Sequence, residues 1–120
     1  MLINISNHPS DSWDQQQLDE ATRLWGGVID LPFPQIDPNW DYNRTEQEAK
    51  KNIETYRREI EKYSGASAFH VMGELVYCFC VVQMLKREGY SVVASTTERT
   101  VVMNNGVKES HFGFVQFREY

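Results

Sequence analysis

Cysteine, long apolar runs and basic side chains are all scarce in this sequence, and each shortage excludes a class of protein. Cys78 and Cys80 lie two residues apart without a second Cys or His pair at zinc spacing. We therefore expect two reduced core thiols and a reducing, cytoplasmic location. The longest apolar stretch, Val76–Val82, is far too short to span a bilayer, and the N-terminal residues do not resemble a signal peptide.

The charge balance and the absence of phosphate and metal motifs narrow the range of possible ligands. Twelve basic residues against 17 acidic ones give a net charge of −5, which argues against binding to duplex nucleic acid. A small anionic ligand held by a few local donors stays compatible with that charge. No phosphate-loop or Gly-x-Gly-x-x-Gly motif is present. His8, His70 and His111 have no recognised metal spacing, so we predict neither a metal site nor a cofactor.

Apolar runs alternate with helical patterns along a chain whose 120 residues suit one domain, residues 1–120. The predicted strands are Leu2–Ile5, Val28–Leu31, Ala66–Val71 and Tyr90–Ala94. The motif Asn104-Asn105-Gly106, between Thr100–Met103 and Phe112–Phe117, predicts a β-hairpin.

Three helices are expected between the strands. Ser12 with Gln15, and Thr45 with Glu48, are capping-box pairs that predict where the first two helices begin. The third, Glu74–Glu88, is apolar on nearly every side, so it is either the most buried helix of a monomer or the interface of a homodimer.

This order predicts an α/β fold: a single Rossmann-like domain with a mainly parallel sheet, three helices and a C-terminal antiparallel β-hairpin. Polar clusters follow three of the predicted strands. They are Ser6–Ser10, His70–Glu74 and Ser95–Arg99. Ligands of open α/β sheets bind beyond the carboxyl ends of the strands, so we expect these clusters to meet at one edge.

Each cluster has a functional and a structural interpretation. In the first, Asn7 and Ser10 are candidate ligand contacts, and His8 is a candidate general acid or base unless it only caps a helix or faces solvent. In the second, Met72 and Gly73 precede a helix N-terminus, which can bind an anion. Glu74 then either contacts a ribose or acts as a base, or simply balances the helix dipole. His70 is more typical of a core histidine.

The third cluster combines hydroxyl groups with a guanidinium. Ser95, Thr96, Thr97 and Arg99 suit phosphate recognition, although the same residues are also typical of a hydroxyl-rich strand with a surface ion pair. The stretch Pro32–Arg44 holds three of the four prolines and predicts an ordered surface loop. Its aromatic residues Trp40 and Tyr42 are candidate contacts to a protein partner.

The strand followed by Asn7-His8-Pro9-Ser10, the third helix that begins after Gly73, and the Ser95-Thr96-Thr97 segment resemble the smallest CRISPR-associated Rossmann-fold proteins. These relatives of the CARF sensor domains are homodimers that bind cyclic oligoadenylates, and those that cleave them are called ring nucleases. The resemblance implies a role in antiviral signalling.

It also implies metal-independent cleavage, in which a ribose 2′-hydroxyl attacks the adjacent phosphate. His8 is then the proton carrier, and Arg99 and the helix start at Gly73 stabilise the phosphate charge. Two alternative functions are compatible with the same predicted fold. One is an N-glycosidic-bond hydrolase or transferase with Glu74 as nucleophile, and the other is a non-catalytic domain that senses a nucleotide or binds a protein.

Overall fold

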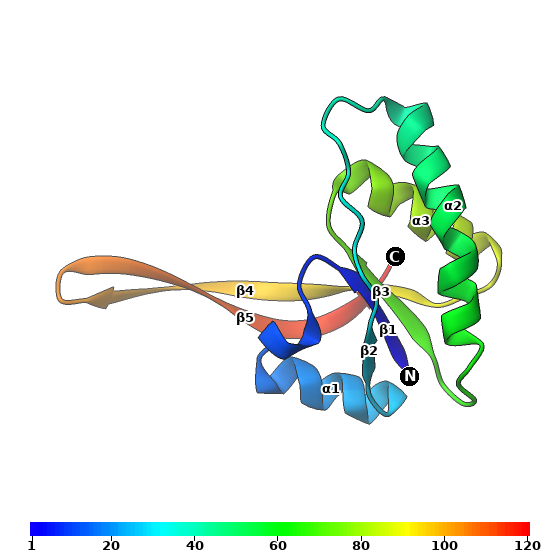
Figure 1. Ribbon diagram of the computed structural model, residues 1–120. Helices are drawn as coiled ribbons and strands as arrows, with labels where there is room; N and C mark the ends of the chain where they lie inside the picture. The colour runs from blue at the N-terminus through cyan, green and yellow to red at the C-terminus, as the bar shows by residue number, and fades with distance from the viewer.

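The computed structural model describes residues 1–120, which form one five-stranded sheet between helices (Figure 1). Helix α1 lies on one face of the sheet, and α2 and α3 lie on the other. The elements in chain order are β1 (Leu2–Ser6), a 3-10 turn (Ser10–Ser12), α1 (Gln15–Trp25), β2 (Val28–Asp30), α2 (Tyr42–Ile60), β3 (Ala68–Met72), α3 (Leu75–Arg87), β4 (Val92–Asn104) and β5 (Val107–Glu119). The predicted Rossmann-like α/β fold with a C-terminal hairpin is confirmed.

The strand order is β2-β1-β3-β4-β5, with β5 alone antiparallel to its neighbour. The chain moves from β1 outward to β2 and then crosses back to β3 on the other side of β1. In open α/β sheets such a reversal leaves a crevice at the carboxyl ends of the two central strands. Here those ends are Ser6 of β1 and Met72 of β3, which are direct neighbours in the sheet.

The two faces of the sheet carry different cores, because successive strand side chains point to opposite sides. The α2/α3 face holds the larger cluster, which includes Ile3, Ile5, Phe69, Val71, Tyr77, Val81 and Leu85. The α1 face holds a small cluster of Leu2, Trp13, Ala21, Ala68 and Val93. Polar Asn4 and His70 are also buried on this second face, beside Trp13.

Both predicted capping boxes are wrong. Helix α1 begins after Asp14, whose carboxylate accepts a hydrogen bond from Gln17 N, whereas Ser12 belongs to the preceding 3-10 turn. Helix α2 begins after Asp41, which caps Arg44 N; Thr45 lies inside the helix and donates its hydroxyl to the Asp41 carbonyl. In both places an aspartate competes successfully with a nearby hydroxyl for the position that precedes the helix.

Helix α3 matches its predicted range closely, with Glu74 as N-cap and Glu88 as C-cap. Its inner side is buried, but Leu75 and Phe79 remain exposed. The homodimer prediction for this helix stays a prediction.

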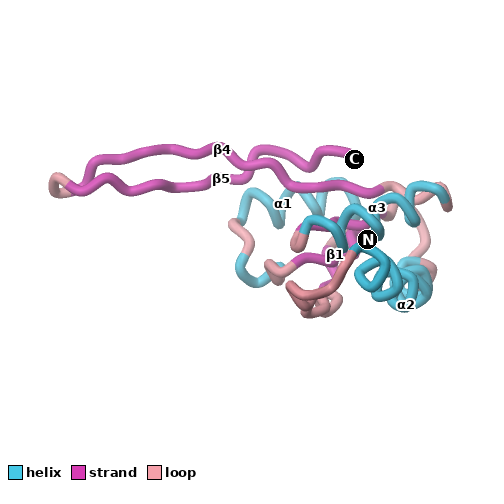
Figure 2. Tube along the Cα trace, turned by 90° about the horizontal axis from the view of Figure 1, so that it is seen from above, coloured by secondary structure: helices cyan, strands magenta, loops and turns pink.

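The last two strands form a long arm. We had expected a strand that ends at Ala94, followed by Ser95–Arg99 either as a phosphate-binding cluster or as a hydroxyl-rich strand. The structure has the second alternative, since β4 continues through these residues to Asn104. The predicted Asn-Gly turn is confirmed, and Asn105 and Gly106 both have positive φ angles. Beyond the end of β3 the hairpin has no neighbouring strand and projects from the body (Figures 1 and 2).

We predict that Asp14→Ala lowers the free energy of unfolding by about 1–2 kcal/mol, because the α1 cap is lost. The same carboxylate also accepts from Phe114 N of β5, at 3.3 Å. Urea unfolding followed by Trp fluorescence measures the change. Ser12→Ala is the matched control and should change stability by less than about 0.5 kcal/mol; an equal loss in both variants contradicts the assignment of Asp14 as the cap.

Candidate functional site

A pocket of about 670 Å³ opens at the carboxyl edge of the sheet, beside the chain reversal between β1 and β3. Side chains from the ends of β1 and β2, the segment after β2 and the start of α3 line it. The lining residues are Asn4, Ser6, Asn7, Pro9, Asp30, Leu31, Pro32, Phe33, Pro34, Gln35, Ile36 and Glu74. They comprise amides, a hydroxyl and two carboxylates, together with apolar side chains, and they include no Lys or Arg.

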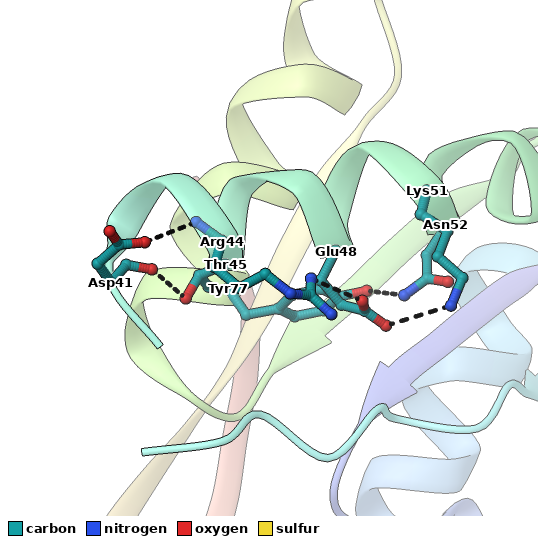
Figure 3. A network of polar contacts seen from close by, with 7 residues as sticks. All are labelled: Asp41, Arg44, Thr45, Glu48, Lys51, Asn52 and Tyr77. Carbon is teal, nitrogen blue, oxygen red and sulfur yellow. Dashed lines mark hydrogen bonds and ion pairs between the residues drawn. The ribbon is translucent and has the colours of Figure 1, made fainter. Parts of the chain in front are cut away.

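One wall of the pocket is the segment Leu31–Ile36, which Phe33 holds in place. The Phe33 ring lies so close to Gly73 that a Cβ atom there would come 2.4 Å from Phe33 Cζ. Phe33 also packs edge-on against Tyr77 of α3, with ring centroids 5.4 Å apart. Tyr77 is buried and accepts a hydrogen bond from Asn52 of α2, as Figure 3 shows. The contact between α2 and α3 therefore positions the pocket wall.

The lack of a side chain at Gly73 lets another part of the protein approach the start of α3, because the Phe33 ring occupies the space where a Cβ atom would lie. Its role as a ligand contact stays a prediction. The Glu74 carboxylate accepts from Tyr77 N at 2.7 Å, so it caps the helix that we had considered as an anion site. Glu74 is exposed and also lines the pocket, which keeps its carboxylate accessible to a ligand.

The turn that carries His8 is fixed through its backbone. The His8 carbonyl accepts hydrogen bonds from Asn4 Nδ2, Ser6 Oγ and Trp13 Nε1, each at 3.0 Å. The His8 side chain is exposed, between the two pocket-lining residues Asn7 and Pro9. Ser10 does not line the pocket; its N–H and hydroxyl donate to the Asp30 carboxylate, at 3.0 and 2.7 Å.

A row of polar contacts crosses four strands beside the pocket, and its two central members, Asn4 and His70, are buried. Asn4 Nδ2 donates to Asp30 Oδ1 of β2, and Asn4 Oδ1 lies 2.8 Å from His70 Nδ1 of β3. Since the Asn4 amide hydrogens are used for His8 and Asp30, its oxygen must accept, and His70 Nδ1 carries the proton. His70 Nε2 is then free to accept from the Ser95 hydroxyl of β4, at 3.0 Å.

His70 is kept neutral in this row. Burial lowers its pKa from the ordinary value of 6.5 to about 4, and the nearby His8 adds a smaller effect in the same direction. The interpretation of His70 as a core histidine therefore describes its position well. Met72 also belongs to this region, since its sulfur accepts a hydrogen bond from Ser95 N at 3.3 Å and lies 3.1 Å from Ser95 Oγ.

The remaining candidates of the third cluster lie away from the pocket lining. Thr96 hydrogen-bonds across the hairpin to the Gln116 carbonyl, and Thr97 is exposed. Arg99 is on the arm, where its guanidinium donates to Ser110 Oγ. The structure thus brings the first two clusters together at the carboxyl edge and carries Arg99 away from them along β4.

Sequence reasoning missed Asn4, Asp30 and the Leu31–Ile36 wall as parts of the site. Asn4 and Asp30 each interrupt an apolar strand with a polar side chain, and this interruption was the available signal. The structure contains no group of three His, Cys, Asp or Glu side chains placed to hold a metal ion. None of its helices is long and apolar enough to cross a membrane.

Comparison with known proteins identifies the family of this chain. One family profile, described as Uncharacterized protein MJ1673 family, matches residues 1–118. The chain belongs to this family. No curated protein and no solved structure matches the chain.

The neutral state of His70 predicts how stability depends on pH. Between pH 6.5 and 4 the unfolded chain protonates this histidine while the folded protein does not, so stability falls as the pH is lowered through that range. At 1.36 kcal/mol per pKa unit, the loss attributable to His70 approaches about 3 kcal/mol.

Urea unfolding at pH 7 and pH 4.5 tests this for wild type, His70→Gln and the exposed control His111→Gln. His70→Gln should lose about 2–3 kcal/mol less stability than wild type on acidification, and His111→Gln should behave as wild type. An unchanged pH dependence in His70→Gln contradicts the prediction.

Proposed function

We propose that the carboxyl-edge pocket binds nucleoside units of a nucleotide ligand, with a cyclic oligoadenylate as the leading candidate. The observation that carries the proposal is the pocket lining itself. Amide groups of Asn7 and Gln35 suit the hydrogen-bonding edge of a base, and the carboxylates of Asp30 and Glu74 suit ribose hydroxyls. Pro32, Phe33 and Pro34 offer apolar surface to the face of a base.

The absence of Lys and Arg from the lining favours base and ribose recognition over phosphate recognition in this pocket. The phosphates of a bound ligand would then face outward, toward the helix start and the exposed His8. This arrangement supports a nucleotide sensor, which needs only to bind its ligand, whereas ring cleavage also needs a group that transfers a proton. Ring cleavage is an additional proposal that depends on His8 as proton carrier.

Isothermal titration calorimetry with cyclic tetra- and hexa-adenylate tests the binding proposal, with AMP and ATP as comparators. Wild type should bind at least one of the cyclic ligands. Gly73→Ala should weaken binding roughly 10-fold or more, because its methyl group displaces Phe33 from the pocket wall.

Gly113→Ala is the matched control, since a Cβ atom there meets nothing within 4 Å. Asn7→Ala, at an exposed lining residue, should weaken binding without changing the melting temperature. Failure of wild type to bind any cyclic oligoadenylate, or equal affinity in Gly73→Ala and Gly113→Ala, overturns the proposal.

A second candidate function is N-glycosidic-bond hydrolysis, and the position of Glu74 in a pocket without cations favours it. In this reaction the Glu74 carboxylate attacks C1′ of the ribose, the C1′–N bond breaks, and the leaving base takes a proton from solvent. Water then attacks C1′, which frees the carboxylate and returns a proton to solvent.

Product analysis after incubation with cyclic oligoadenylates and nucleosides, with and without EDTA, separates the two chemistries. Glycosidic cleavage releases free base and should be abolished in Glu74→Gln, which retains an oxygen able to cap α3. Ring cleavage gives linear products, persists in EDTA and should be abolished in His8→Ala. A glycosidic activity that survives Glu74→Gln, or a ring cleavage that survives His8→Ala, contradicts the corresponding mechanism.

A further inference from the structure

We infer that the β4–β5 arm is a dimerisation element that pairs with the arm of a second copy, antiparallel to it. The arm is the part of the hairpin from Thr97 to Phe114 that extends past the end of β3 (Figures 1 and 2). Every residue from 97 to 113 is exposed. A lone two-stranded ribbon of this kind is only marginally stable in water unless something packs on it.

One face of the arm carries an apolar stripe. Phe112, Val101 and Met103 are exposed by 66%, 52% and 62%, respectively. They alternate along the paired strands, so they point to the same side. This side continues the α1 face of the body. Phe114 lies two residues before Phe112 toward the body, so it points to the same side, and it is buried beside Phe117. The stripe is therefore an extension of the small core without a cover.

Charge is segregated between the two faces of the arm. Arg99 and Lys108 lie on the striped face, and the bond from Arg99 to Ser110 confirms that these positions share a side. Glu98 and Glu109 lie on the opposite face, paired with Gly113 and Val102, respectively. The striped face thus carries two basic residues and no acidic one.

The root of the arm provides a complementary receptor. A groove of about 390 Å³ lies between α1 and β5, lined by Gln15, Gln16, Asp19, Glu20, Arg23, Phe114 and Val115. Glu20 is paired with Arg23. Within the groove, the Asp19 carboxylate accepts a hydrogen bond only from the neutral side-chain amide of Gln15. Near the tip, Lys108 complements the carboxylate of Asp19, and Met103 suits the two apolar residues of the groove, Phe114 and Val115.

A second copy fits these features better than an unrelated protein, because one surface supplies both the stripe and its receptor. With the arms antiparallel about a two-fold axis at the level of the Thr100–His111 pair, each tip lies over the partner's groove, about 25 Å of strand from its own root. Bulky Phe112 then meets the small Ser110 of the partner subunit. Two stripes and two tip contacts bury on the order of 1,000 Å², the lower limit for a specific interface.

The arm leaves the sheet at the same edge as the pocket, because β4 runs parallel to β3. An arm-paired dimer therefore turns the two pockets toward each other. The dimer itself does not depend on the proposed ligand, so its test uses the protein alone.

Sedimentation velocity over a concentration series tests the inference. Wild type should form dimers, and Phe112→Asp should raise the dimer dissociation constant roughly 100-fold or more, because a carboxylate is then buried in the stripe. Val102→Asp, on the opposite face of the same arm, is the matched control and should remain dimeric. A monomeric wild type at about 200 µM, or equal dissociation of both variants, overturns the inference.

Exchange of two charges between the tip and the groove distinguishes a specific loss of arm pairing from a general loss of folding. Lys108→Glu and Asp19→Lys should each weaken the dimer, and the chain that carries both changes should recover it, because the two residues meet across the interface. Absence of recovery in the double variant contradicts the contact between tip and groove.

Discussion

The side-chain amide of Asn4 is the contact on which the site depends most directly. It lies in the middle of the sheet, 1% exposed, and its three hydrogen bonds reach the β2 end, the His8 turn and His70. A buried amide left without partners costs about 1–3 kcal/mol per group, so this arrangement strongly favours one position for each neighbour. The same contact assigns the His70 proton to Nδ1 and makes Nε2 the acceptor for Ser95.

The elements that stabilise the fold also shape the pocket. Phe33 packs on Tyr77 and Gly73, and Tyr77 is in turn held by Asn52 across the interface between α2 and α3. Glu74 caps α3 and lines the pocket with the same carboxylate. A ligand that binds there contacts residues already fixed by packing, which reduces the ordering cost of binding.

The arm follows from the absence of a crossover helix after β4. Strands β1, β2 and β3 must stop at the carboxyl edge so that the chain can turn into the next connection. Strand β4 has no such requirement, since its partner β5 returns directly through the Asn105-Gly106 turn. The pair is therefore free to extend beyond the body, and it takes Arg99 away from the cluster in which the sequence alone had placed it.

Local patterns in the sequence were sufficient for the α/β class, the three helices and the hairpin turn, because periodicity and turn residues act over a few neighbouring positions. They also identified Asn7 and Glu74, which line the pocket. The tertiary structure decided the rest. The strand order, the burial of Asn4 and His70, the contact of Phe33 with Gly73 and the length of β4 all depend on residues distant in the chain, which no local pattern records.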